Sequence, residues 1–395
     1  MLNVPYGWKK ISLGTIGDVA MCKRILKQQT NNIKGVPFYK IGTFGVVADA
    51  YIDNELFQHY KTKYPYPNVG DVLISAAGTI GRLVVFNGEE AYFQDSNIVW
   101  LQNDEKIVLN RYLYYLYQTI KWQTSEGGIV SRLYNNAIRQ TVITLPPIEE
   151  QKKIAGILGT WDRAIEELTR LIAEKKELKR GLMQRLLTGS QRLPGFTKPW
   201  DNIKLVDIAQ ITTAISKSQY IKEIGPYLIV DMGAVSNEAT LIAKKQTDYE
   251  GDFLVCDDLI MPKDDIGGGN IIGKTIVIDC DNKYILGDHV FKIRVTDEYD
   301  AKFISSLINS FEVNKYMRRV STGSAQLGLA KRDVEKCMLF MPVDLAEQKA
   351  IADVLSKADA EIDLLNQQLD VLKEQKRGLM QKLLTGEIRV KVDDK

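Results

Sequence analysis

The chain has few of the side chains that metal sites and disulfide frameworks require. Its 395 residues include two histidines, His59 and His289, and four cysteines, Cys22, Cys256, Cys280 and Cys337. No two cysteines form a CxxC motif, and neither histidine stands at a metal-ligand spacing. This pattern argues against a zinc site. We expect four isolated, reduced thiols in packed positions.

Long hydrophobic runs are also missing. No apolar run approaches the roughly 18 residues that span a bilayer, and the N-terminal stretch MLNVPYGWKK lacks the apolar core of a signal peptide. We therefore expect a cytoplasmic protein. The hydrophobic content of 45% is ordinary for a globular chain, and the length is sufficient for two or three domains.

A strong excess of positive charge is absent as well. The formal net charge is +2, with 15 basic and 11 acidic side chains in residues 1–144 and 19 and 21 in residues 191–340. A purely electrostatic nucleic-acid binder would be far more basic. Any binding of DNA would therefore depend on local patches, on a partner protein, or on both.

Several catalytic motifs are missing too. There is no GxxxxGK[ST] phosphate loop, no [DNS]PP[YFW] tetrapeptide of amino-group DNA methyltransferases, and no Pro-Asp dipeptide of the usual nuclease site. The glycines of Gly78–Gly81 do not form GxGxxG. Paired carboxylates such as Asp264 and Asp265 are more typical of turns. These absences favour a binding protein over an enzyme.

What the chain does contain is an internal repeat. Residues Gln151–Gly189 and Gln348–Gly386 align without a gap at an offset of 197 residues, with about half of the positions identical. Both copies end in KRGLMQ, then Arg or Lys, then LLTG. A period of this length indicates a duplicated domain with its helix rather than a solenoid of small units.

Each repeat is predicted to be one long helix. Apolar residues alternate by four and three, as in Ile154, Leu158, Trp161 and Ile165, which is the 3.5-residue spacing of a coiled-coil seam. Proline precedes each copy, and a glycine suited to a C-terminal cap ends it. A helix of about 39 residues is roughly 58 Å long. The alternative is a helix packed on its own globular core.

The segment before each helix is mixed and rich in short predicted strands. The two segments have diverged, but Trp8–Gly14 resembles Trp200–Val206, and Gly70–Ile74 resembles Cys256–Ile260, which aligns Leu73 with Leu259. We predict an α+β protein with domains at 1–146 and 191–342. A long spacer helix follows the first domain at 147–190, and a second long spacer helix with a C-terminal tail follows the second domain at 343–395.

The repeats point to a known family. The entry LPPIEEQ, the two KRGLMQ[RK]LLTG ends and the GDVL…GTIG stretch resemble the specificity (S) subunit of type I restriction–modification systems. The second half departs from the pattern, with MPVDLAEQ at the helix entry and CDDLIMPKDDIGGG in the domain. This departure fits a second domain that reads a different DNA sequence.

The resemblance implies a non-catalytic subunit. Two target recognition domains would each read one half of a split double-stranded DNA target, mostly in the major groove. The two helices, which the apolar spacing predicts to pack as an antiparallel coiled coil, would fix the spacing between the half-sites. Two methylation subunits would dock on this chain and bring S-adenosylmethionine, so that no cofactor is expected in the chain itself. Restriction (translocase–nuclease) subunits could join the complex.

Candidate DNA-binding residues combine bidentate side chains, which read base edges, with glycine-rich turns, which admit phosphates. For each of them the alternative is an ordinary solvated loop residue. In the first domain they are Lys23, Arg24, Lys27, Gln28, Gln29, Gly78, Thr79, Gly81, Arg82, Arg132, Tyr134, Asn135 and Asn136. In the second domain they are Lys217, Ser218, Gln219, Tyr220, Lys263, Arg318, Arg319, Ser321, Thr322, Ser324 and Gln326.

Candidate partner-binding residues lie in the repeats. The KRGLMQ ends interrupt the apolar seam with charge, and a glycine inside a helix costs about 1 kcal/mol, so close approach by a partner is a better explanation than packing of the pair. The residues are Gln151, Lys179, Arg180, Gly181, Gln184, Gln348, Lys376, Arg377, Gly378 and Gln381. Two rival interpretations remain, a coiled-coil scaffold with two unrelated binding domains and a stand-alone enzyme acting on nucleic acid.

Overall fold

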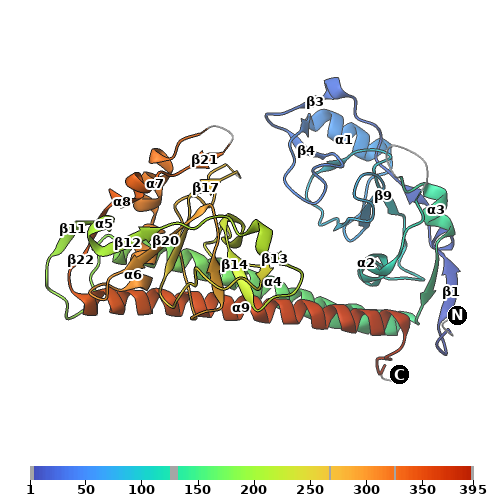
Figure 1. Cartoon of the computed structure of the whole chain (residues 1–395). Helices are drawn as coiled ribbons and strands as arrows, with labels where there is room; N and C mark the ends of the chain where they lie inside the picture. The colour runs from blue at the N-terminus through green and yellow to red at the C-terminus, as the bar shows by residue number, and fades with distance from the viewer. Residues whose placement is uncertain (1–3, 125–131, 267, 324–325, 393–395) are drawn as a thin grey trace. The chain divides into compact units, whose positions relative to one another are not determined.

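The computed structural model describes residues 4–124, 132–266, 268–323 and 326–392. These residues form two compact units. Unit 1 comprises residues 1–168 and 368–395, and unit 2 comprises residues 169–367. Each of the two long helices, α4 (Ile148–Leu186) and α9 (Leu345–Thr385), therefore contributes one end to each unit (Figure 1).

Unit 1 is built on two four-stranded sheets and one strand pair. The first sheet has the order β2 (Val19–Ala20), β9 (Ile98–Leu101), β6 (Val72–Ser75), β7 (Leu83–Val85). The second has the order β3 (Thr30–Asn31), β5 (Tyr51–Ile52), β4 (Val36–Tyr39), β8 (Tyr92–Phe93). The pair is β1 (Lys9–Ser12) with β10 (Val142–Leu145). The helices are η1 (Leu13–Thr15), η2 (Lys27–Gln29), α1 (Asn54–Lys63), α2 (Asn110–Thr119) and α3 (Asn135–Gln140).

Unit 2 repeats this strand order. Its first sheet is β12 (Ala209–Thr212), β20 (Val290–Val295), β16 (Leu259–Pro262), β18 (Ile276–Val277). Its second is β13 (Ile221–Lys222), β15 (Gln246–Thr247), β14 (Tyr227–Val230), β19 (Tyr284–Leu286). The pairs are β11 (Trp200–Lys204) with β22 (Met338–Pro342) and β17 (Asp264–Asp265) with β21 (Leu327–Gly328). The helices are α5 (Leu205–Ile208), η3 (Ser218–Tyr220), η4 (Met232–Ala234), α6 (Ala301–Ile308), α7 (Phe311–Val320) and α8 (Lys331–Glu335). The predicted α+β duplication is confirmed.

One inner strand of each first sheet, β6 or β16, is called its central strand here and is buried on both faces. In β6, Val72 and Ile74 enter a core with the long helices, whereas Leu73 enters a second core with Tyr92 and Trp100. In β16, Leu259 and Met261 enter the core with the helices, and Ile260 enters the other. Side chains alternate between the faces of a strand, so each central strand joins two cores.

This burial corrects the alignment drawn from the sequence. Leu73 was matched with Leu259, but the two side chains enter different kinds of core. Asp71 and Asp258 are the equivalent residues, because each accepts the N–H three positions earlier, at 2.8 Å and 3.0 Å. A shift of one residue moves every side chain to the other face of a strand. The alignment of Leu73 with Leu259 rests on sequence identity alone and is shifted by one residue from the alignment that the packing requires.

The two long helices run antiparallel within each unit. Asp162 of α4 pairs with Lys376 of α9 in unit 1, and in unit 2 Lys175 and Lys179 of α4 pair with Glu361 and Asp359 of α9. The first turns of each helix pack on a domain core, through Ile154 and Leu158 in α4. The coiled-coil and globular-core interpretations are therefore both correct, each for part of a helix.

Two findings, on the cysteines and on the helices, concern the expectations from composition. Cys22 and Cys337 are buried, and burial raises the pKa of each thiol to about 12, which keeps it protonated and inert. Cys256, however, is exposed, so the expectation of four packed thiols is wrong there, because its side chain stands in a turn ahead of β16. In the part of the chain that the structure describes, no helix is long and apolar enough to cross a membrane.

Candidate functional site

The glutamine at the start of each long helix is a structural anchor. Gln151 is fully buried, accepts the N–H of Leu109 at 3.0 Å and donates to the carbonyls of Ile107 and Pro146. Gln348 is also fully buried; it accepts the N–H of Asp300 at 2.9 Å and donates to Pro342. Both amides are used within their own units. We therefore assign these two predicted partner-binding residues a structural role.

The glutamate beside each glutamine holds the tail of the other long helix. Glu150 accepts Nε and Nη2 of Arg389 at 2.7 and 2.8 Å, and Nε1 of Trp8 at 3.2 Å. Glu347 is held in the same way by Arg192 and by Nε1 of Trp200 at 3.3 Å. The alignment of Trp8 with Trp200 is thereby confirmed.

The KRGLMQ ends divide into an inward and an outward face. Lys179 and Lys376 point inward and pair with Asp359 and Asp162 of the opposite helix, and these two ion pairs repeat at the offset of 197 residues. Their charges in the apolar seam are thus explained by the helix pair itself. The remaining predicted partner-binding residues face outward.

The outward faces of the two copies carry the same side chains. Arg180 and Arg377 each pair with a glutamate three residues earlier and are 73% and 77% exposed, and Gln184 and Gln381 are exposed. Beyond the helix's own backbone, a Cβ added at Gly181 or at Gly378 would meet no described atom within 4 Å. Nothing in the described chain therefore covers these glycines.

The polar run after β2 forms an exposed edge of unit 1. Lys23, Arg24, Lys27 and Gln28 are exposed, and Lys23 Nζ lies 5.1 Å from the centre of the Tyr64 ring. Gln29 is half-buried, and its Oε1 accepts the N–H of Leu26 at 2.8 Å, which closes the turn at η2. Gln29 therefore shapes the run rather than extending from it.

The glycine turn after β6 also folds as a compact unit. Gly78 and Gly81 have positive φ, which glycine adopts without strain, and Thr79 is exposed at the tip. Ser75 Oγ donates to the Thr79 carbonyl at 2.6 Å, and Arg82 Nη1 donates to the Phe44 carbonyl at 2.8 Å. Arg82 thus holds a neighbouring loop with part of its guanidinium.

A third group of predicted residues meets the first through one turn. Arg132 Nη2 donates to Asn97 Oδ1 at 3.3 Å, and Arg24 Nε donates to Oδ2 of Asp95 at 2.9 Å. The turn Asp95–Asn97, ahead of β9, therefore brings two distant arginines to one place. Tyr134 and Asn136 are exposed and Asn135 half-buried at the start of α3. Sequence reasoning missed Asp95 and Asn97, because neither stands in a motif.

In unit 2 the predicted residues behave differently. Lys217 is buried, pairs with Asp252 at 2.6 Å and lies 4.7 Å from the centre of the Tyr249 ring. It is therefore an internal anchor and not a surface contact, which corrects that prediction. Tyr220 is half-buried against Tyr249, whereas Ser218 and Gln219 are exposed.

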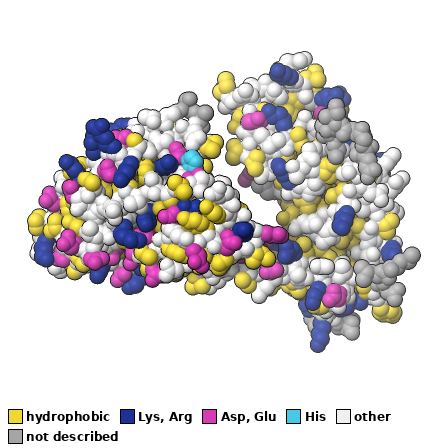
Figure 2. Space-filling view, viewed as in Figure 1, with side chains coloured by type: hydrophobic (Ala, Val, Ile, Leu, Met, Phe, Trp, Pro, Cys, Tyr) yellow, Lys and Arg dark blue, Asp and Glu magenta, His cyan; other side chains and the backbone are white. Residues whose placement is uncertain are grey.

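The second basic group of unit 2 lies at α7. Arg318 and Arg319 are exposed in its last turn, and Lys and Arg side chains gather over α7 and α8 in Figure 2. Thr322 and Gln326 are exposed, while Lys263 and Ser321 are half-buried. Ser324 lies outside the described residues. Sequence reasoning missed His289, whose Nδ1 lies 2.6 Å from Oδ2 of Asp264.

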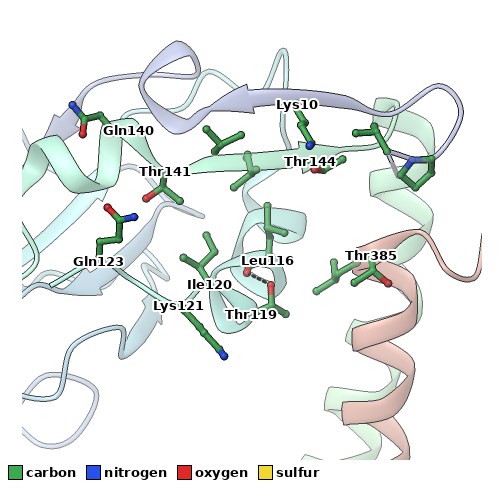
Figure 3. A pocket seen from close by; sticks show the side chains of 15 residues that line it. Lys10, Leu116, Thr119, Ile120, Lys121, Gln123, Gln140, Thr141, Thr144 and Thr385 are labelled. Carbon is green, nitrogen blue, oxygen red and sulfur yellow. Dashed lines mark hydrogen bonds between the residues drawn. The ribbon is translucent and has the colours of Figure 1, made fainter. Parts of the chain in front are cut away.

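One open hollow of about 560 Å³ lies in unit 1, away from these residues. It is bordered by β1, β10 and the ends of α2 and α9, with Thr119, Thr144 and Thr385 in its lining (Figure 3). Its lining includes Lys10 and Lys121 but no acidic, histidine or cysteine side chain. Among the described residues, no cluster of three potential metal ligands occurs.

Comparison with known proteins decides the family. The model of the type I restriction modification DNA specificity domain matches the chain twice, at residues 5–179 and 197–374. The chain belongs to this family. It is thus a type I specificity subunit, with two recognition domains and a non-catalytic role.

The similar proteins match either part of the chain or nearly all of it. A type I restriction enzyme specificity subunit of Haemophilus influenzae is 55% identical over 169 residues, which is 43% of this chain and 44% of that protein. The MjaVIII specificity subunit of Methanocaldococcus jannaschii is 26% identical over 99% of this chain and 95% of its own. The type I S subunit of M. genitalium has the same fold, with a TM-score of 0.63 at 14% identity over 97% of both chains.

The two recognition domains of this specificity subunit differ at one equivalent place. Asn97 and His289 occupy the same position, since the carbonyl of each accepts the N–H of the residue that follows its central strand, Ala76 or Lys263. Around it, unit 1 carries Arg132 and unit 2 carries Asp264. One framework thus presents two different sets of polar side chains.

Proposed function

We propose that this specificity subunit gives a type I complex its DNA target, with each recognition domain reading one half of a bipartite site. The observation that carries this proposal is the repeated strand order with different polar side chains at equivalent positions. Bidentate donors such as Arg24 and Arg132 suit base edges in the major groove. The balance of charge near zero implies weak binding by the chain alone.

The helices supply the second part of the proposal. They hold the recognition domains at a fixed spacing, and the outward faces at Gly181 and Gly378 each dock one methylation subunit. Two equal faces on one chain support two such subunits. These would bring S-adenosylmethionine and the catalytic residues, and restriction subunits would join the same assembly on DNA.

The deciding experiment is co-expression with a methylation subunit of the same system, followed by methylation-sensitive sequencing of the host DNA. We expect one modified motif made of two short blocks around a gap of constant length. A stable complex that modifies no such motif would contradict the proposal and favour the scaffold interpretation. Turnover of nucleic acid by the purified chain alone would instead support the interpretation of the chain as a stand-alone enzyme.

A further inference from the structure

The two partners of the Arg24–Asp95 ion pair differ strongly in solvent exposure. The side chain of Arg24 is 67% exposed, whereas that of Asp95 is 15% exposed. Only Nε of the guanidinium contacts the carboxylate, at 2.9 Å. Within the described ranges, Nη1 and Nη2 have no hydrogen-bond partner. The carboxylate therefore holds the inner edge of the guanidinium, and the outer edge is left to a ligand.

Asp95 is itself fixed by the turn that contains it. Ser96 Oγ donates to Asp95 Oδ2 at 3.3 Å, and the N–H of Asn97 donates to the Asp95 carbonyl at 2.7 Å. Ser96 has a φ of 60°, a left-handed conformation that is costly for a residue with a Cβ. Such strain persists only where the surroundings impose it. An ion pair as exposed as this one adds little stability, so its main effect is to orient Arg24.

The free outer edge matches one DNA base. Two parallel N–H groups of arginine pair with O6 and N7 of guanine in the major groove. Fixing the guanidinium in advance lowers the entropy that binding would otherwise cost. An open hollow of about 460 Å³, lined by Lys23, Tyr64 and Asp95 among others, lies beside Arg24 and leaves it accessible.

The Asp95 carboxylate also makes a base a more suitable ligand for Arg24 than a phosphate. A negative charge at Asp95 weakens the attraction of Arg24 for a charged phosphate more than for a neutral guanine. Lys23, which lacks an acidic neighbour among its described contacts, suits a phosphate better. The same turn holds Arg132 through Asn97, so a second donor stands close to the first.

We propose that Arg24 reads a guanine in one block of the target and that Asp95 is the residue that positions it. This inference rests on the proposed function and names the base that one domain recognises. Arg24 is the base contact, and Asp95 acts through it.

The test compares modified motifs for Arg24→Ala, Asp95→Ala and Asp95→Asn, each co-expressed with the methylation subunit. Arg24→Ala and Asp95→Ala relax the same single guanine, with discrimination at that position reduced about 10- to 100-fold. Asp95→Asn keeps an oxygen to accept Nε and retains most of the discrimination. Asp104→Ala, which removes the exposed Asp104–Lys106 pair at the other end of β9, is the control and leaves the motif unchanged.

Other outcomes overturn the inference. If Arg24→Ala lowers modification equally at every site and keeps the same motif, Arg24 contacts a phosphate and not a base. If Arg24→Ala loses discrimination at a base other than guanine, Arg24 does not read a guanine. If Asp95→Ala modifies an unchanged motif, Asp95 does not position Arg24. If Asp95→Ala fails to assemble, Arg24→Lys carries the same test, because it keeps the charge and loses the two-pronged donor. Failure of the proposed function is distinct, since the unaltered chain would then yield no two-block motif.

Discussion

At the scale of single residues, the most informative side chains are the buried polar ones at the helix starts. Gln151 and Gln348 each satisfy backbone groups of a loop and of the preceding strand's end. Glu150 and Glu347 each fix a tail that belongs to the other helix. These four residues link the recognition domains to the helices, and the same Glu-Gln pair stands at the start of both helices because both units need the link.

Replacing Gln151 with Leu leaves an N–H and two carbonyls without partners in a buried place. We expect a loss of about 1–3 kcal/mol in the stability of unit 1, seen as a lower midpoint of thermal unfolding. Gln184→Leu is the matched control, since the same side chain is exposed on the same helix, and we expect a change within about 0.5 kcal/mol. Equal effects of the two substitutions would contradict the assigned role of Gln151.

Because Glu347 is buried, we can predict which variants of its ion pair with Arg192 are the less stable to heat. Arg192→Leu leaves a carboxylate that is 0% exposed, with the Trp200 N–H as its remaining partner among the described residues. The double variant Arg192→Leu, Glu347→Leu removes the stranded charge as well. We expect the single variant to unfold at the lower temperature. A double variant that is the less stable of the two would show that the pair contributes more than it costs to bury.

At the scale of elements, the outward face of each KRGLMQ end is the feature to test. Gly181→Leu with Gly378→Leu adds bulk at positions where an added Cβ meets no described atom within 4 Å beyond the helix's own backbone, so we expect the fold to be kept and helix propensity to rise by up to about 1 kcal/mol per site. We expect the methylation subunit to stop co-purifying with this double variant.

The matched control replaces both glycines with alanine. Alanine gives the same gain in helix propensity with only one added carbon, and we expect assembly to be kept. Unchanged co-purification of the leucine variant would move the docking site elsewhere. Loss of the helical circular dichroism signal would show that the glycines serve the fold.

At the scale of the whole molecule, unit 1 draws on both ends of the chain. Its core includes Leu383 and Leu384 of α9 together with Ile154 and Leu158 of α4. The first half of the chain alone lacks α9, yet it contains the similar sequence KRGLMQRLLTG and the tail residue Arg192. A second copy of that half could supply what α9 supplies.

We therefore expect the fragment 1–195 to form a homodimer, measured by light scattering coupled to size exclusion. Leu186 and Leu187 of one copy would replace Leu383 and Leu384, and Arg192 would replace Arg389 against Glu150. The control is Leu186→Asp with Leu187→Asp, which we expect to be monomeric or unfolded. A folded monomer of the unaltered fragment would refute the exchange.

The repeat and its periodicity were enough to predict the duplication, the long helices and the α+β class. They could not give the register of β6 against β16, because packing of alternate side chains decides it and identity at Leu73 and Leu259 misled. Residues chosen by type lie on the surface only where no contact distant in sequence buries them. Lys217 and Gln151 are buried by contacts distant in sequence, and Asp95 matters only through Arg24.

The sharing of each long helix between the units has a genetic consequence. The two repeats encode nearly the same interface, so a crossover within their coding sequences would exchange one complete recognition domain and leave both tails, Arg192 and Arg389, with a matching glutamate. New targets could thus arise by recombination in a single event, without an intermediate that fails to fold. Selection can then act on the domains as interchangeable cassettes.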